Sequence, residues 1–211
     1  MNLNLDKLIA DGKKISKERI AEIEKRKIEE DEKQKQIELE KRIRQKIPTR
    51  FYNSVPDTNR IAKSVIEYSQ NFFDNIKKGV NLGIAGDTGT GKTFDIFYLL
   101  KKYKYTNFQY VQLNVLFEQD VFQKDAKVIF IDDIDKVPTT RRHEILKVND
   151  WYIEQLYYIV DYRYRNLLPI FFTTNQSKKG LLNLFGDALV RRLIENAKIS
   201  VKKNKKNSIL S

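Results

Sequence analysis

The chain has 211 residues, of which 41% are hydrophobic, a length and composition that suit one well-buried domain with an appendage. It has no cysteine, which excludes disulfides, thiolate zinc sites and cysteine catalysis, and its one histidine, His143, cannot form an imidazole cluster for a metal. The formal net charge of +12 favours polyanionic partners, above all nucleic acid.

The first segment, residues 1–47, is rich in Glu, Lys, Arg, Gln and Ile and has a single glycine, a composition typical of a helix. Oppositely charged pairs at helical spacing, such as Glu22 with Arg26, support this prediction. Charges begin at Asp6 and no apolar run has the length of a signal peptide or membrane span, so we expect a cytoplasmic protein. The segment is either a solvated, partly frayed helix or a docking arm that orders on a partner.

A boundary follows at Pro48 and the turn-rich residues 53–59. We place the folded core at residues 48–201 and a basic tail at 202–211. Between Arg60 and Lys78, apolar residues recur at helical intervals and predict a helix. The short apolar run from Val80 to Ala85 predicts a buried strand.

Residues 86–93 (GDTGTGKT) match the phosphate-binding pattern G-x-x-x-x-G-K-[ST] at every fixed position. A predicted strand before this P-loop and a predicted helix over residues 93–102 give it the context that its chemistry needs. Backbone N–H groups can bind phosphate oxygens, Lys92 can reach the β- and γ-phosphates, and the Thr93 hydroxyl can ligate Mg²⁺. The predicted nucleotide-binding residues are Gly86, Asp87, Thr88, Gly89, Thr90, Gly91, Lys92 and Thr93.

Two further strands are predicted at Phe108–Leu113 and Lys127–Asp133. The second ends in Asp132 and Asp133, at the edge where parallel α/β sheets gather ligands. Asp132 can hold Mg²⁺ together with the P-loop threonine, and Asp133 is placed to polarise an attacking water. The polar connection over residues 135–147 is either solvated or a basic contact for nucleic acid or a neighbouring subunit.

The later part of the chain predicts a helix, a strand and a second helix. Residues 150–166 form the clearest amphipathic segment, whose core candidates are Trp151, Ile153, Leu156, Tyr157, Val160 and Tyr164. The strand Leu168–Asn175 ends in an amide that can sense a γ-phosphate or orient water. The second helix, Gly186–Ala197, presents Arg191 and Arg192. We therefore expect a three-layer α/β P-loop domain with about five parallel strands.

Taken in order, the segments GDTGTGKT, VIFIDD, WYIEQLYYIVDYRYRNLLPIFFTTN and GDALVRRL resemble the AAA+ ATPases of the DnaC-type helicase loaders and the related IstB-type transposition helpers. The resemblance covers about residues 50–200 and is most specific over residues 151–175. It implies that Lys92 and Thr93 belong to Walker A, that Asp132 and Asp133 form Walker B, and that Asn175 is sensor 1.

Arg192 matches the arginine finger that such proteins insert into a neighbour's ATP site, with Arg191 as the alternative, and a finger implies head-to-tail association. The resemblance implies an ATP- and Mg²⁺-dependent helicase loader in DNA replication, gripping a replicative helicase through the arm, or single-stranded DNA. No segment after Ser200 is long enough for a helical lid, so we expect weak or partner-dependent turnover. A transposition helper, a non-hydrolysing nucleotide-bound interaction module and, less well matched, a P-loop kinase remain as alternatives.

Overall fold

The computed structural model describes residues 5–55, 57–113, 125–137, 139–142, 145–148 and 150–203, with the backbone alone for residues 5–19 and for the two short strands between 139 and 148. The chain divides into two compact units, Met1–Arg42 and Ile43–Ser211. The division falls five residues before the boundary that the sequence suggests, because Ile43 and Ile47 are buried in the second unit.

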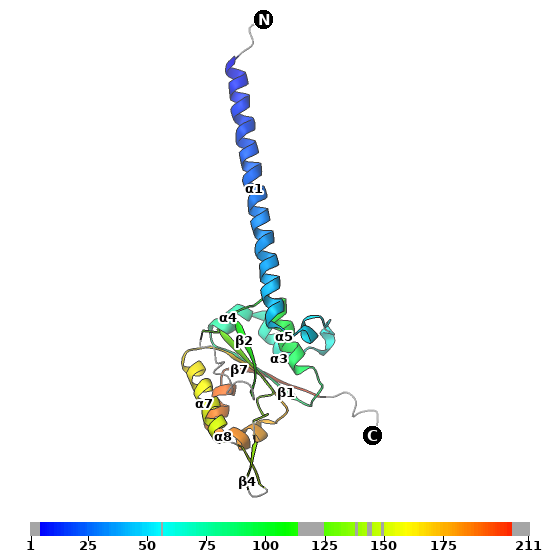
Figure 1. The fold of residues 1–211 in the computed structure, drawn as a ribbon, viewed down its shortest axis with the longest axis vertical. Coiled ribbons are helices and arrows are strands. Elements are labelled where there is room, and N and C mark those ends of the chain that lie inside the picture. Colours follow the sequence, from blue (N-terminus) through cyan, green and yellow to red (C-terminus); the bar gives the residue numbers. More distant parts are fainter. Residues whose placement is uncertain are drawn as a thin grey trace. The chain divides into compact units, whose positions relative to one another are not determined.

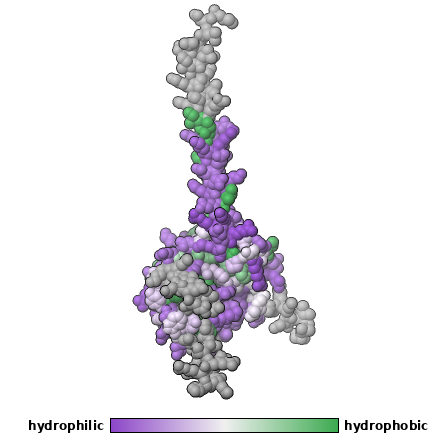
Figure 2. Space-filling view, viewed as in Figure 1, coloured by the Kyte–Doolittle hydropathy of each residue, from purple (hydrophilic) through white to green (hydrophobic). Residues whose placement is uncertain are grey.

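The first unit is made by most of helix α1, which spans Leu5–Lys46 and confirms the predicted helix. Over residues 20–42, the face of this helix seen in Figure 2 is largely hydrophilic, with isolated hydrophobic residues. The predicted ion pair between Arg26 and Glu22 is present at 2.8 Å, and Arg42 pairs with Glu38 at 2.6 Å. Four isoleucines of this unit are more than half exposed: Ile20, Ile23, Ile28 and Ile37.

The second unit is built on a five-stranded parallel sheet in the order β2-β3-β6-β1-β7. Its strands are β1 (Asn81–Gly86), β2 (Phe108–Gln112), β3 (Val128–Asp132), β6 (Ile170–Thr174) and β7 (Ala197–Lys202). The three central strands are mostly buried, as expected for a parallel sheet covered on both faces. The predicted parallel sheet is therefore confirmed, and its order places the carboxyl ends of β3, β6 and β1 side by side.

Helices cover both faces of the sheet (Figure 1). The first layer contains α3 (Lys63–Gln70), α4 (Phe72–Lys77) and α5 (Lys92–Lys102), preceded by the short α2 (Thr49–Tyr52) and the 3₁₀ turn η1 (Thr58–Arg60). The single helix predicted over residues 60–78 is wrong, because the backbone at Asn71 (φ −134°, ψ 46°) separates α3 from α4. Ile43, Ile47, Tyr68 and Phe97 pack together in the core beneath this layer.

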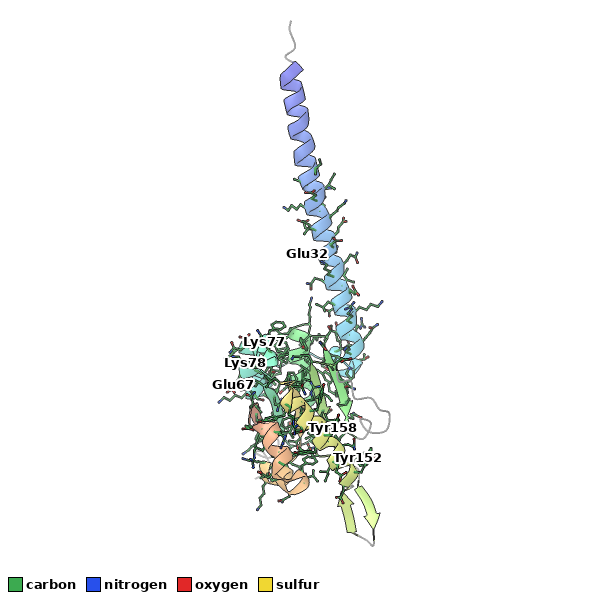
Figure 3. The ribbon with its side chains drawn as sticks, turned by 90° about the vertical axis from the view of Figure 1, so that its left-hand side faces the viewer. Glu32, Glu67, Lys77, Lys78, Tyr152 and Tyr158 are labelled. Atoms are coloured by element: carbon green, nitrogen blue, oxygen red, sulfur yellow. The ribbon has the colours of Figure 1, made fainter. Side chains whose placement is uncertain are left out.

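The second layer consists of α7 (Asp150–Arg165) and α8 (Lys178–Ile194). Its buried residues include Leu156 and Val160, as predicted. Trp151 and Tyr164, also predicted for the core, are instead 47% and 43% exposed on α7. Figure 3 shows the side chains of Tyr152 and Tyr158 on the same helix. This aromatic-rich helix thus buries the aliphatic residues Leu156, Ile159 and Val160 and leaves several of its rings at the surface.

Arg163, at the end of α7, holds the amino-terminal ends of two strands together. It is fully buried and its guanidinium donates hydrogen bonds to the carbonyls of Ala126, Lys127 and Pro169, which precede β3 and β6. Burial lowers the pKa of Arg163 to about 10. Arg163 is therefore a structural residue that supports the sheet.

The structure differs from the sequence-based expectations at two further places. Residues 178–185 extend α8 towards its amino end, and Gly186 (φ 77°) kinks the helix where a start was predicted. The segment 135–147, interpreted from sequence as a polar connection, contains most of an antiparallel hairpin of β4 (Thr139–Arg142) and β5 (Ile145–Val148). His143 and the tail from residue 204 lie outside the described residues. Among the described helices, none is both long and apolar enough to cross a bilayer.

Candidate nucleotide site

The P-loop joins the carboxyl end of β1 to the first residue of α5, as predicted. Its three glycines, Gly86, Gly89 and Gly91, have φ values of 136°, 80° and 84°, which L-residues with side chains rarely adopt. Gly86 has a second constraint, because a Cβ there would overlap the backbone carbonyl of Lys202 on β7. The glycines therefore set the bend of the loop and allow β7 to lie against it.

Lys92, the first residue of α5, is 5% exposed and turns back into the loop. Its ammonium donates to the carbonyl oxygens of Gly86 (2.8 Å) and Asp87 (2.9 Å) and to Asn175 Oδ1 (2.8 Å). Burial lowers the pKa of Lys92, and the charges of nearby carboxylates, Asp133 first, oppose that shift. The cation is thus fixed between the P-loop and the end of β6, where a phosphate oxygen can replace one of its acceptors.

Asp132, the last residue of β3, is held by hydroxyl groups from three other elements. Its Oδ1 accepts from Thr93 Oγ1 at 2.8 Å and from Thr173 Oγ1 at 2.6 Å, and its Oδ2 accepts from the Tyr110 hydroxyl at 3.3 Å. Burial, reinforced by the Asp132 charge, raises the pKa of Tyr110 to about 12, so this ring remains a hydrogen-bond donor. The sequence singled out Thr93 and Asp132, but it did not predict that Tyr110 orients the carboxylate.

The Thr93–Asp132 pair suits Mg²⁺ bound with a nucleotide. Mg²⁺ usually takes one or two protein carboxylates and fills its remaining positions with substrate phosphates and water. Among the described residues, no group of three or more His, Cys, Asp or Glu side chains forms a self-sufficient metal site. A hydroxyl and a carboxylate in direct contact beside the P-loop therefore fit a metal that arrives with phosphates better than a permanent structural metal.

Asp133 lies just beyond β3 with a left-handed backbone (φ 49°), a conformation that Asp tolerates better than most residues. Its backbone N–H donates to Thr173 Oγ1 at 2.8 Å, which fixes the turn. Its carboxylate contacts Lys136 Nζ at 2.6 Å and accepts from Asn175 Nδ2 at 3.4 Å. The carboxylate raises the pKa of Lys136. The Asp133 side chain is 27% exposed and lies at the edge of the site, between the Lys136 ammonium and the Asn175 amide.

Asn175 links Asp133 and Asp135 to the P-loop. Its Oδ1 accepts from Lys92 at 2.8 Å and from the Thr88 hydroxyl at 3.4 Å. Its backbone N–H donates to Asp135 Oδ1 at 2.9 Å, and the same oxygen accepts from the Thr174 hydroxyl at 2.7 Å. Asp135, for which the sequence analysis predicted no role, therefore fixes the backbone that presents the predicted sensor amide.

Two hollows open on this cluster. One of about 450 Å³ lies against Gly89, Thr90 and Gly91 and extends to the linker residues Ser54, Val55, Asp57, Asn59, Arg60 and Ile61. Another of about 340 Å³ is lined by Asp132 and Asp133 together with Gln112, Leu113 and Lys136. The cluster therefore has space for a ligand on the P-loop side and on the aspartate side.

Arg192 lies apart from this cluster within the chain. Its Nε pairs with Asp161 at 2.7 Å, and its guanidinium lies over the rings of Tyr157 and Tyr164. Within the described part of the chain, none of these partners belongs to the P-loop or to β3. The neighbouring Arg191 is exposed and pairs with Asp187 one turn earlier on α8. A finger role requires a second subunit, so for both arginines it stays a prediction.

Comparison with known proteins gives a short sequence match and a clear fold match. No protein-family model matches the chain. A stretch of 72 residues, 34% of the chain, is 36% identical to Phage-like element PBSX protein XkdC from Bacillus subtilis (strain 168). The match spans only a quarter (25%) of the length of that phage-element protein.

Similar solved structures include the DnaC helicase loader, with a TM-score of 0.57 and 23% identity over 74% of this chain and 100% of that one. DnaI follows with a TM-score of 0.54 and 17% identity, over 75% of this chain and 92% of that one. The replication initiator DnaA bound to AMPPCP and single-stranded DNA has a TM-score of 0.50 and 18% identity, over 74% of this chain and 50% of that one. These matches confirm the predicted P-loop fold, which this chain shares with the solved structures of the DnaC helicase loader, DnaI and DnaA.

Proposed function

We propose that the protein is an ATP-binding and ATP-hydrolysing helicase loader of the DnaC type that acts in DNA replication. The observation that carries this proposal is the meeting of Lys92, Thr93, Asp132 and Asn175, from three separate elements, at one edge of the sheet. A coincidental match to the P-loop pattern would not place Thr93 against Asp132 and Lys92 against Asn175.

Nucleotide binding would use the P-loop amides and the amino end of α5 for the phosphates, with Lys92 on the β- and γ-phosphates. Thr93 and Asp132 would hold Mg²⁺, which neutralises negative charge on the phosphates when it is bound. The hollow of about 450 Å³ beside the loop has room for the nucleoside.

Hydrolysis would use Asp133 to orient and polarise a water in line with the γ-phosphorus. The carboxylate is exposed enough to meet water, and its contact with Asn175 aims it along the site. Asn175 would sense the γ-phosphate, since its amide oxygen is already in contact with the Lys92 ammonium. Lys92 and the loop amides would stabilise the negative charge that develops on the transferred phosphoryl oxygens.

The finger arginine would come from a neighbouring subunit, with Arg192 as the first choice. Its ring contacts and its pair with Asp161 hold its head in a defined position on α8. A residue that serves another subunit's site gives a head-to-tail assembly, either a closed ring or an open spiral.

The proposed partners are a replicative helicase and single-stranded DNA. Support comes from the fold shared with the DnaC helicase loader and with DnaA, whose structure contains single-stranded DNA. The formal charge of +12 also favours binding to a polyanion. The charged α1 unit, with isolated isoleucines on a hydrophilic surface, suits an arm that docks on a protein partner.

Affinity capture tests the proposal. Tagged protein is incubated with ATP and Mg²⁺ in lysate of the native host and, separately, with purified replicative helicase, and Lys92→Ala serves as the matched control. ATP-dependent retention of the helicase by wild type, but not by the control, supports helicase loading. Retention of a transposase would support a transposition helper instead. Helicase capture without any turnover, even with DNA present, would support a non-hydrolysing interaction module.

A further inference from the structure

Lys202, the last residue of β7, lies beside the P-loop although it is remote from the P-loop in sequence. β7 pairs with β1 so that Lys202 stands opposite Gly86, the first glycine of the motif. Its Nζ lies 3.6 Å from the position that a Cβ on Gly91 would occupy, so the ammonium is next to the last turn of the loop. The residue is part of the sheet, and its side chain is 14% exposed.

Asp95 positions this lysine. The Asp95 carboxylate, on the first turn of α5, is 2% exposed and its Oδ2 accepts from Lys202 Nζ at 2.6 Å. The same oxygen accepts from the backbone N–H of Ala62 at 2.8 Å. Burial raises the pKa of Asp95, and the hydrogen bond from Lys202 opposes that shift. The pair therefore joins β7, α5 and the start of α3 at one point.

The pair lies in the wall of the hollow that opens on the P-loop. That hollow of about 450 Å³ is lined by Gly89, Thr90, Gly91, Asp95 and Lys202, among others. Its charged lining residues are three cations and two carboxylates: Arg60, Lys202, Lys203, Asp57 and Asp95. The wall thus carries a net charge of +1, which favours an anionic ligand.

We propose that Lys202 is a second phosphate-binding lysine, which contacts the α- or β-phosphate of the bound nucleotide from the side of the P-loop opposite Asp132. This inference rests on the proposed nucleotide binding. A lysine ammonium has three donors, and Asp95 takes one of them. Lys92 serves the γ-phosphate end, next to Asn175, whereas Lys202 serves the end that leads to the nucleoside hollow.

The proposal predicts a defined pattern of nucleotide affinity. Losing one charge-assisted hydrogen bond to phosphate should weaken binding roughly tenfold to a hundredfold. Because the α- and β-phosphates are common to both nucleotides, ATP and ADP should lose affinity by the same factor. A lysine that served only the γ-phosphate would affect ATP alone.

The experiment measures the Kd of ATP and ADP for the full chain by isothermal titration calorimetry, with the melting temperature of each variant recorded beside it. Lys202→Met removes the cation but leaves the buried Asp95 carboxylate without it. The double variant Asp95→Asn/Lys202→Met removes both charges and so avoids an unpaired buried carboxylate. Lys198→Met, an exposed lysine on the same strand, is the matched control and should bind as wild type does.

Equal loss of ATP and ADP affinity in the single and the double variant supports a phosphate contact. Restoration of wild-type affinity in the double variant would show that Lys202 only balances the charge of Asp95, and would overturn the proposal, as would a loss confined to ATP. Failure of the wild-type chain to bind either nucleotide would instead refute the proposed function, and this inference with it.

Discussion

The Thr93 hydroxyl donates to Asp132 Oδ1 at 2.8 Å and so joins the helix after the P-loop to the end of β3, across 39 residues of sequence. Neither residue alone distinguishes a nucleotide site from an ordinary turn. Their contact, with the Lys92 ammonium nearby on the same helix, creates an edge where phosphate and its metal can be bound together.

Asp133→Asn should block hydrolysis while leaving ATP binding intact. Asparagine has nearly the same shape and tolerates the left-handed backbone at this position (φ 49°), so the fold should be retained. Loss of the carboxylate removes the group that polarises water, and we expect phosphate release to fall about a hundredfold or more. Single-turnover phosphate release, measured beside ATP affinity, checks this. Asp74→Asn, an exposed carboxylate change on α4, is the control, and normal turnover in Asp133→Asn would remove that residue from the mechanism.

Gly86→Ala and Gly89→Ala should differ sharply in stability although both positions have positive φ. At Gly89 a Cβ meets nothing within 4 Å, so the cost is backbone strain of about 1–2 kcal/mol. At Gly86 a Cβ overlaps the Lys202 carbonyl, so β7 must move as well. Urea unfolding should therefore show a larger loss for Gly86→Ala, and equal losses would mean that β7 does not pack on the loop as described.

The prediction of the P-loop edge from sequence worked because its signals are local. A fixed glycine spacing, an apolar run ending in Asp132 and Asp133, and a strand ending in Asn175 each predict their own element. Parallel strands then bring those ends together. The sequence could not show the supporting contacts from Tyr110 and Asp135, because those depend on which strands become neighbours.

The sequence analysis did not locate β7 and placed Lys202 in the tail, and the reason is the inverted hydrophobic pattern of that edge strand. Ile199 and Val201 are 42% and 65% exposed, whereas Ser200 and Lys202 are more buried and contact polar partners. The hydrophobic periodicity of residues 197–202 therefore does not predict a strand of the core sheet. From sequence alone, Lys202 was therefore placed at the start of the basic tail. Trp151 was misplaced for a related reason: helical spacing predicts that a large ring is buried, but here it lies on the solvent side of α7.

Mixing two inactive variants tests the predicted arginine finger. Arg192→Ala should bind ATP but hydrolyse it slowly, because its own site lacks a neighbour's arginine. Asp133→Asn should be inactive in its own site but able to supply Arg192 to the next subunit. If the finger acts between subunits, a mixture should recover steady-state ATPase activity that neither variant has alone.

Arg191→Ala is the matched control for this experiment, since the two arginines are adjacent on α8 and Arg191 pairs only one turn away. No recovery in the Arg192→Ala mixture, with recovery in an Arg191→Ala mixture, would transfer the finger role to Arg191. An Arg192→Ala protein that no longer binds ATP as a monomer would show that its ring and ion-pair contacts serve the fold instead.

Removal of residues 1–42 should spare the core and weaken helicase capture. Ile43 and Ile47 are 0% and 2% exposed, so a cut at residue 42 keeps them, whereas a cut at residue 47 deletes both. Loss of a buried isoleucine side chain costs about 2–5 kcal/mol, so the shorter protein should melt at a lower temperature. Normal helicase capture by the 43–211 protein, with an unchanged melting temperature, would refute the docking-arm role.

The central claim is that Lys92, Thr93 and Asp132 together bind a nucleotide with Mg²⁺. Calorimetric titration of ATP with and without Mg²⁺, on wild type, Lys92→Ala and Asp132→Asn, tests it most directly. We predict that wild type binds more tightly with Mg²⁺, that Asp132→Asn loses this Mg²⁺ dependence, and that Lys92→Ala shows no measurable binding. Undiminished, Mg²⁺-dependent ATP binding by Lys92→Ala would contradict the assignment.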